Sequence, residues 1–231
     1  MTRPLHAIIL DFDGVIANSE GLHLRAFQDV LAGSPLTLTD EAYFAKYLGF
    51  DDLGVLRTLG ADQEVDLAAG ELERFCQAKA RRYDELATQG EMLFPGAADF
   101  IRHASAAVPL AIASGALTHE IEDVLRHAGL RDLVLAVVGA DQTAQSKPAP
   151  DPYLEAFARL GSATGRTLER RRTVAVEDSR WGLESARAAG LRTVAVTTTY
   201  AADALAAHAE LVVDGLATLQ LESLDRLCEG N

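Results

Sequence analysis

The stretch LHAIILDFDGVIANSE, residues 5–20, runs from an almost wholly apolar segment directly into two aspartates, Asp11 and Asp13, with Gly14 next. Residues 5–11 have the continuous apolar character of a strand that is buried on both faces. Two carboxylates at the end of such a strand repel each other and are costly to bury. The stretch therefore indicates a bound cation or a catalytic task at the end of a buried strand.

The second part of the chain alternates apolar runs with helical patterns. The apolar runs cover residues 109–114, 133–140, 173–178, 193–197 and 210–214. Each is apolar throughout and does not alternate with polar residues, which is typical of a parallel sheet that helices cover on both faces. Together with the first strand, these runs predict an α/β fold with a doubly wound, Rossmann-like parallel sheet.

Residues 17–92 differ from the rest of the chain. They show helical periodicity with few strand signals, and segment 67–86 is expected to form one long helix. We therefore expect two domains. Residues 1–16 and 93–231 would form a Rossmann-like catalytic core, and residues 17–92 a small helical cap inserted after the first strand.

The composition restricts the partners and the location. The chain has 231 residues, 48% of them hydrophobic and 24% charged, with a formal net charge of −13. This charge argues against polyanionic partners, so we expect neither nucleic acid nor a membrane to bind. No apolar run approaches the roughly 20 residues that span a bilayer. The apolar run near the N-terminus is too short for a signal peptide. Two isolated cysteines are typical of a protein in a reducing compartment. We expect a cytoplasmic monomer or homodimer.

Ligands of doubly wound sheets bind at the carboxyl ends of the strands. Polar residues follow the predicted strands at these ends: Asp11 and Asp13, Ser114 and Gly115, Lys147 in the loop after the third strand, and Glu177 and Asp178. Acidic groups, a hydroxyl beside a backbone turn and one lysine would converge on a single edge of the sheet. This combination predicts a site for a metal ion and a phosphate.

These residue types suit phosphoryl transfer. Mg²⁺ prefers oxygen ligands and keeps several waters, so two or three carboxylates are enough to hold it. A carboxylate can attack phosphorus to form an aspartyl-phosphate, provided that Mg²⁺ and Lys147 offset the repulsion between two anions. Ser114 and a backbone N–H would hold the phosphoryl oxygens. A second carboxyl two residues further on shares the same face of an extended segment and could transfer a proton to the leaving oxygen.

Four segments carry a resemblance to a known family: DFDGVIANSE (11–20), AIASGA (111–116), SKPAPDPY (146–153) and VAVEDSRWG (174–182). They resemble the four motifs of haloacid dehalogenase-like hydrolases, in the order that this superfamily uses. The early helical insertion is similar to that of the subfamily of phosphatases and β-phosphoglucomutases with a small helical cap. The resemblance implies a Mg²⁺-dependent phosphatase that acts on a small phosphorylated metabolite.

The same resemblance implies a role for each motif residue. Asp11 is implied as the nucleophile, and Asp13 as the general acid/base that also lends its backbone carbonyl to Mg²⁺. Asp178 is implied as a metal ligand, while Glu177 is a direct or water-mediated metal partner, or a structural one. The remaining expected catalytic and substrate-binding residues are Ser114, Lys147, Gly115, His23, Asp51 and Asp52. His23 lies where many relatives have a histidine facing the cleft, and a packing or surface role fits its position almost equally well.

Several positions depart from the family pattern. Many relatives have aspartate after the DxDG turn, whereas this chain has Asn18. Mutase members carry a Lys-Asn pair just after the motif serine and an arginine in the cap. The corresponding places here are Leu117-Thr118 and Asp51-Asp52. A mutase needs a cation for the phosphate distant from the nucleophile, so these positions favour a hydrolase.

Three other functions fit parts of the pattern. The nearest rival is a β-phosphoglucomutase-type sugar phosphate mutase. A dehalogenase is less consistent with the sequence, because Asp13 supplies an acid/base that carbon–halogen displacement does not need. A receiver-type signalling module also pairs acidic residues, a hydroxyl and a lysine on a doubly wound sheet, but it is much shorter and needs no cap.

Overall fold

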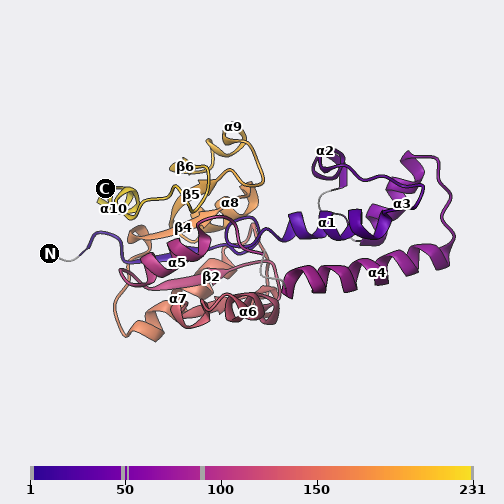
Figure 1. Ribbon diagram of the computed structural model, residues 1–231. Coiled ribbons are helices and arrows are strands. Elements are labelled where there is room, and N and C mark those ends of the chain that lie inside the picture. The colour runs from indigo at the N-terminus through magenta and orange to yellow at the C-terminus, as the bar shows by residue number, and fades with distance from the viewer. Residues whose placement is uncertain (1–2, 48–49, 51, 89–91, 230–231) are drawn as a thin grey trace. The chain divides into compact units, whose positions relative to one another are not determined.

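A six-stranded parallel sheet lies at the centre of the core (Figure 1). The computed structural model describes residues 3–47, 50, 52–88 and 92–229. The strands are β1 (Ala7–Leu10), β2 (Leu110–Ala113), β3 (Ala136–Val138), β4 (Thr173–Glu177), β5 (Arg192–Val196) and β6 (Leu211–Val213). Their order is β3-β2-β1-β4-β5-β6, with every neighbouring pair parallel. This order confirms the predicted doubly wound α/β fold.

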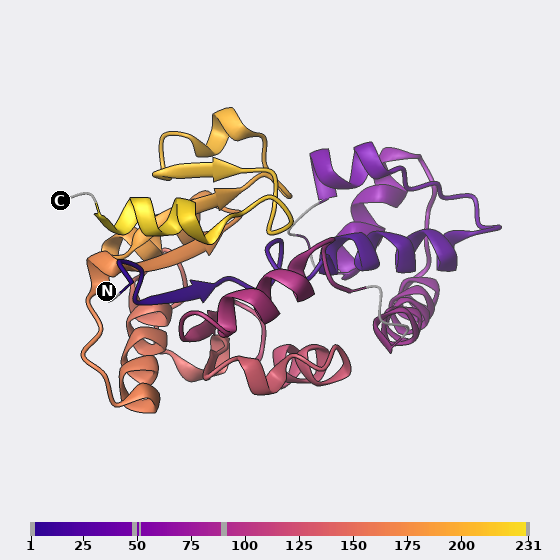
Figure 2. The ribbon, with the colours of Figure 1, turned by 60° about the vertical axis from the view of Figure 1, so that its left-hand side comes forward.

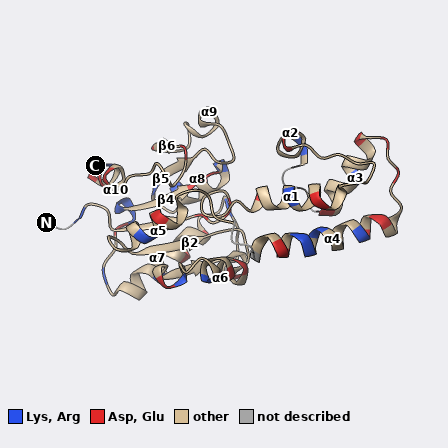
Figure 3. Cartoon of the chain, in the orientation of Figure 1, with Lys and Arg blue, Asp and Glu red and all other residues tan. Residues whose placement is uncertain are grey.

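β1 holds the position that matters for the site. It pairs with β2 on one side and with β4 on the other, so the chain winds first in one direction from β1 and later in the other. The place between β1 and β4 is therefore a point where the strand order reverses, and ligands of such sheets bind at the carboxyl ends of the strands there. β1 and β2 are fully buried and carry no charged residues (Figure 3).

β3 is shorter than the apolar run 133–140 suggests. Arg131–Leu133 form a short 3₁₀ turn, and the strand covers only Ala136–Val138. Apolar residues before the strand still pack, because Val134 is buried and Leu133 lies against the same hydrophobic cluster. The run is therefore largely buried, with Leu135 and Ala140 exposed, and it is too long as a prediction of the strand.

Helices cover both faces of the sheet. They are α5 (Ala97–Ser105), α6 (Thr118–His127), α7 (Asp151–Thr164), α8 (Arg180–Ala188), α9 (Ala202–Leu205) and α10 (Leu221–Glu229). On one face, Ile8 and Leu10 of β1 pack with apolar residues of α5, α6 and α10. On the other face, Ala7 and Ile9 pack with residues of α7 and α8. This arrangement explains why β1 is apolar at every position.

The chain divides into two compact units, one built from residues 1–18 and 93–231 and the other from 19–92. The boundary lies two residues later than the sequence suggested. The reason is local, since the N–H of Ala17 donates to the carbonyl of Phe12 at 2.9 Å and Ala17 also bridges to Asp13 and Leu93. These contacts attach residue 17 to the core unit.

The second unit, residues 19–92, is helical (Figure 2). It contains α1 (Ser19–Leu31), α2 (Asp40–Ala42), a π-helical turn (Tyr43–Tyr47), α3 (Asp52–Asp62) and α4 (Ala69–Thr88). It has its own apolar cluster, in which Phe27, Leu56 and Leu59 are almost fully buried.

Among the described parts of the chain, no helix combines the length and the apolar character that crossing a membrane requires.

Candidate active site

The turn after β1 positions the first aspartates. The N–H of Asp11 donates to the carbonyl of Val176 at 2.9 Å, which extends the pairing of β1 with β4 by one residue. The chain then turns sharply, with Gly14 at φ +76°, a left-handed conformation that favours glycine. Asp11 is buried and Asp13 is half-buried within this turn.

Three buried carboxylates meet where β1 and β4 end. Asp11, Glu177 and Asp178 each offer an oxygen atom, and these atoms all lie within 4.8 Å of one another. The pairing of β1 with β4 brings their ends together, so residues more than 160 positions apart in sequence share one edge. The structure therefore brings together three of the four acidic residues that the sequence placed at this edge, and the side chain of Asp13 is not part of this group among the described residues.

Lys147 supplies a positive charge to this cluster. Its Nζ lies 2.8 Å from Asp11 Oδ1 and 2.5 Å from Glu177 Oε1, and its side chain is only 13% exposed. Burial by itself lowers the pKa of Lys147, but the carboxylates of Asp11 and Glu177 outweigh this effect and raise the pKa overall. The ammonium is therefore charged at any physiological pH.

The carboxylate of Glu177 is held by donors on both oxygens. Oε1 accepts hydrogen bonds from Lys147 Nζ and, at 2.9 Å, from the hydroxyl of Tyr153. Oε2 accepts from the N–H groups of Asp178 and Ser179 and, at 3.0 Å, from Ser179 Oγ. Of the roles that the sequence left open for Glu177, this geometry fits the structural one, in which Glu177 positions Lys147 beside Asp11.

Two glycines leave room for the acidic pair. A Cβ atom on Gly182, in the first turn of α8, would lie 1.7 Å from Glu177 Oε1. A Cβ on Gly14 would lie 2.0 Å from Asp178 Oδ2. The carboxylates of Glu177 and Asp178 therefore occupy space that the side chain of any residue other than glycine would need at positions 182 and 14.

The cluster carries more negative charge than Lys147 neutralises. Burial and the nearby Glu177 carboxylate raise the pKa of Asp11 well above its usual value, although Lys147 opposes the shift. Burial and Glu177 also raise the pKa of Asp178 to about 7, while a hydrogen bond from Thr199 opposes this shift. A further cation at this place would relieve the repulsion.

Ser114 and Gly115 follow β2 at the same edge of the sheet. Ser114 is 3% exposed, and its N–H donates to the carbonyl of Val138 at 3.0 Å. Its hydroxyl oxygen accepts a hydrogen bond from the N–H of Ala116 at 3.1 Å, which leaves the hydroxyl proton available as a donor. Gly115 is exposed, with open space where a Cβ would be. This pair is suited to donate hydrogen bonds to an oxyanion.

Two predicted residues of the helical unit, His23 and Asp52, meet at Lys79. Lys79 Nζ lies 2.5 Å from His23 Nδ1 and donates to Asp52 Oδ1 at 2.6 Å. The His23 ring stacks on Tyr83, with ring centroids 4.3 Å apart. Burial, followed by the charge of Lys79, lowers the pKa of His23 to about 4, so its imidazole is neutral at pH 7. Asp51 lies outside the described residues.

The model of the haloacid dehalogenase-like hydrolase family matches residues 8–196. The chain belongs to the haloacid dehalogenase-like hydrolases. The matched range includes β1 except Ala7, all of β2 to β5 and the helical unit, so the family assignment covers the acidic cluster, Ser114 and Lys147.

Relatives within the haloacid dehalogenase-like hydrolases agree with this assignment. Protein CbbY of Rhodobacter capsulatus is 34% identical over 212 residues, which are 85% of this chain and 87% of that protein. The crystal structure of CbbY from Rhodobacter sphaeroides in complex with xylulose-(1,5)bisphosphate is 30% identical and has a TM-score of 0.69, covering 96% of this chain and 99% of that one. The fructose-1-phosphate phosphatase YqaB of Escherichia coli is 28% identical over 82% of this chain and 95% of its own length. The chain is a phosphoric monoester hydrolase of this family.

Sequence reasoning missed two residues that contact the predicted site residues in this hydrolase. Tyr153 lies in the SKPAPDPY segment, where the aromatic residue after the lysine was the available signal, and its hydroxyl bonds Glu177. Lys79 had no such signal, because a lysine on a long amphipathic helix ordinarily faces solvent. In the structure it is 2% exposed.

The contact between Tyr153 and Glu177 leads to a prediction. Replacing Tyr153 by Phe removes one of the two donors to Glu177 Oε1 while keeping the aromatic ring that packs under Lys147. We expect the free energy of unfolding to fall by about 1 kcal/mol. Urea denaturation measures this, with Tyr200→Phe on the surface as the control that should change little. An unchanged stability in Tyr153→Phe would show that this hydrogen bond contributes nothing.

Proposed function

We propose that the chain is a Mg²⁺-dependent phosphatase that hydrolyses a small phosphorylated metabolite through an aspartyl-phosphate on Asp11. The observation that carries the proposal is the carboxylate of Asp11 at the end of β1, 2.8 Å from the ammonium of Lys147 and buried beside Glu177 and Asp178. A buried carboxylate in such a setting has a cation beside it that draws in an anionic phosphate.

Two chemical steps follow from this arrangement. In the first, an oxygen of Asp11 forms a bond to phosphorus while the bond from phosphorus to the substrate's ester oxygen breaks, and Asp13 donates a proton to that oxygen. In the second, Asp13 accepts a proton from a water that attacks the phosphorus, and the bond between Asp11 and phosphorus breaks. Inorganic phosphate and an alcohol leave, and both aspartates return to their initial protonation.

The remaining residues hold the phosphoryl group. The hydroxyl of Ser114 has a free proton to donate to a phosphoryl oxygen, since its own oxygen already accepts from Ala116. The N–H of Gly115 lies in an exposed turn beside it. Lys147, fixed by Glu177, offsets charge on the same group. These donors are in place before the substrate arrives, which lowers the cost of reorganisation during the reaction.

The donor set fits Mg²⁺. The cluster consists of buried carboxylates, which are the hard oxygen ligands that Mg²⁺ prefers. Burial and, after it, repulsion from Glu177 raise the pKa values of Asp11 and Asp178, and a bound cation would offset both effects. The side chains of Asp11 and Asp178 and the backbone carbonyl of Asp13 would hold the ion. Mg²⁺ would reduce the repulsion between Asp11 and the phosphate.

The names of the relatives support the substrate class. Fructose 1-phosphate, named for YqaB, and xylulose-(1,5)bisphosphate, bound to CbbY, are both small phosphorylated carbohydrates. We propose that this chain also acts on a molecule of that size. A sugar phosphate mutase is the second candidate, and it would isomerise β-glucose 1-phosphate instead of releasing phosphate from it.

Metal dependence tests the cofactor part of the proposal. We expect that dialysis against a chelator abolishes hydrolysis of p-nitrophenyl phosphate and that Mg²⁺ restores it. Ca²⁺ should not restore it, because its larger and looser coordination shell misplaces the phosphate. Mg²⁺ should also raise the melting temperature of the metal-free protein, since it binds only the folded acidic cluster.

A variant with a weakened cluster makes the metal test specific. Asp178→Asn removes one carboxylate and should reduce both the activity and the rise in melting temperature caused by Mg²⁺. Asp99→Asn changes an exposed carboxylate of α5 and should leave both as in the wild type. Full activity of chelated protein, with metal content verified by elemental analysis, would overturn the proposed Mg²⁺ dependence.

A further inference from the structure

A loop of the core unit contacts both strand ends that carry the acidic cluster. Three threonines in succession, residues 197–199, follow β5 at the carboxyl edge of the sheet. β5 pairs with β4 and is not a neighbour of β1 in the strand order. The loop nevertheless reaches Gly14 in the turn after β1 as well as Asp178 just after β4. It therefore joins two segments that lie far apart in sequence.

The turn that follows Asp13 is fixed by hydrogen bonds on both sides of Gly14. The carbonyl of Gly14 accepts a hydrogen bond from the hydroxyl of Thr198. The N–H of Gly14 donates to the carbonyl of Ala17 at 2.9 Å. This N–H belongs to the same peptide unit as the carbonyl of Asp13, and in a trans peptide the two groups point in opposite directions. The bonds to Gly14 therefore set the direction of the Asp13 carbonyl.

The next residue of the loop holds Asp178. The side chain of Thr199 donates a hydrogen bond to the carboxylate of Asp178. Both side chains lie over the Cα of Gly14, because a Cβ added there would lie 2.0 Å from Asp178 Oδ2 and 3.0 Å from Thr199 Oγ1. Thr198 and Thr199 are both half-buried. Adjacent threonines thus contact the turn after β1 and the carboxylate after β4.

These contacts lie beyond the point to which the strands pair. The pairing of β1 with β4 extends to the N–H of Asp11 and the carbonyl of Val176, before the chain reaches Asp13 and Asp178. Mg²⁺ demands a nearly ideal octahedral arrangement of its ligands, so it binds poorly to ligands whose separation varies. A loop that holds both segments after the pairing has ended would restrict this separation.

We infer that Thr198 and Thr199 are positioning residues of the proposed Mg²⁺ site, which hold the carbonyl of Asp13 and the carboxylate of Asp178 in place relative to each other. Neither threonine is a ligand in this role, since Thr198 acts through the Gly14 turn and Thr199 acts through Asp178. The inference rests on the proposed function and extends its metal site to the loop after β5.

Calorimetric titration of the metal-free protein with Mg²⁺ tests the inference without measuring activity. Thr199→Val keeps the shape of the side chain and removes the hydroxyl, and we expect it to raise the Kd for Mg²⁺ by roughly tenfold. Thr198→Val should raise the Kd in the same direction. Thr199→Ser keeps a hydroxyl and should restore a Kd close to that of the wild type. A role in folding alone would lower the melting temperature of the metal-free protein and leave the Kd unchanged.

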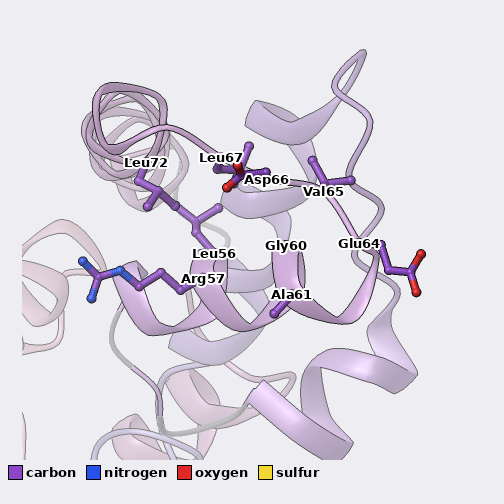
Figure 4. Close-up of a pocket in the computed structure, with 9 residues that line it drawn as sticks. All are labelled: Leu56, Arg57, Gly60, Ala61, Glu64, Val65, Asp66, Leu67 and Leu72. Carbon is purple, nitrogen blue, oxygen red and sulfur yellow. The ribbon is translucent and has the colours of Figure 1, made fainter.

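Two control variants should bind Mg²⁺ as the wild type does. Thr164 of α7 is also half-buried and its hydroxyl donates to the carbonyl of Leu160 at 2.8 Å, so Thr164→Val removes the same kind of bond outside the acidic cluster. Asp66 belongs to the helical unit, where it lines a hollow together with Arg57 and Glu64 (Figure 4). Asp66→Asn removes a carboxylate that is not part of the acidic cluster.

A double-mutant cycle shows whether Thr199 acts through Asp178. In the Asp178→Asn background the carboxylate that accepts the hydrogen bond is already absent. Thr199→Val should therefore change the Kd for Mg²⁺ much less in this background than in the wild type. Equal effects in the two backgrounds would contradict a role of Thr199 through Asp178.

The possible results distinguish a failure of the inference from a failure of the proposed function. A wild-type Kd in either valine variant, with its fold verified by circular dichroism, would overturn the inference and leave the Mg²⁺-dependent phosphatase intact. Either variant is sufficient for this test if the other does not fold. A wild-type protein that binds no Mg²⁺ would overturn both the inference and the Mg²⁺ dependence on which it rests.

Discussion

Asp11→Asn is expected to lower kcat by roughly 10⁴-fold or more. The amide has nearly the size of the carboxylate and keeps the packing at the end of β1, but its oxygen carries no negative charge and is a poor nucleophile toward phosphorus. The variant also loses the charge that pairs with Lys147 at 2.8 Å. Steady-state release of phosphate from p-nitrophenyl phosphate measures the effect.

A direct readout of the intermediate strengthens this test. Rapid acid quenching of the wild type during turnover should trap phosphate on the chain, and mass spectrometry should locate it on Asp11. The exposed Asp123→Asn on α6 is the control and should keep wild-type activity. Substantial activity of Asp11→Asn, after mass spectrometry has excluded deamidation back to aspartate, would show that Asp11 is not the nucleophile.

Gly182→Ala is expected to reduce both stability and activity, although alanine is the better helix former. The added Cβ would lie 1.7 Å from Glu177 Oε1, so the carboxylate must move. Movement weakens its hydrogen bonds with Lys147, whose side chain is 13% exposed, and with the buried Tyr153. Since each buried partner left unsatisfied costs about 1–3 kcal/mol, we expect a loss of about 2–4 kcal/mol in the free energy of unfolding.

The activity of the same variant should fall because Lys147 loses the group that holds it beside Asp11. Gly161→Ala is the matched control, since Gly161 lies within α7 and a Cβ added there would have no neighbouring atom within 4 Å. That change should raise stability by up to about 1 kcal/mol through helix propensity. If both glycine variants are stabilised alike, Gly182 has no role in accommodating Glu177.

The sequence alone determined the fold class, and it pointed to candidate residues for the core site. Apolar runs without alternation identify strands buried on both faces, because a parallel sheet covered by helices leaves no face for polar side chains. The place of the site can also be predicted from the sequence, because parallel strands bring their carboxyl ends to one edge of the sheet. Asp11, Ser114, Lys147, Glu177 and Asp178 can therefore be selected from their places after the predicted strands.

The tertiary structure decided what individual side chains contact. The sequence left Glu177 open as a metal partner or a structural residue, and only the positions of Lys147, Tyr153 and Ser179 around it distinguish the two. The end of β3 and the boundary at residue 18 also depended on packing and on bridges between distant segments.

The helical unit shows this limit most clearly. Helical periodicity says which residues share a face, but it does not say which partner that face meets. Lys79 binds Asp52, 27 positions away, and His23, 56 positions away, on other helices. Such contacts depend on how helices pack against each other, and packing is set by many weak apolar contacts that no short stretch of sequence contains.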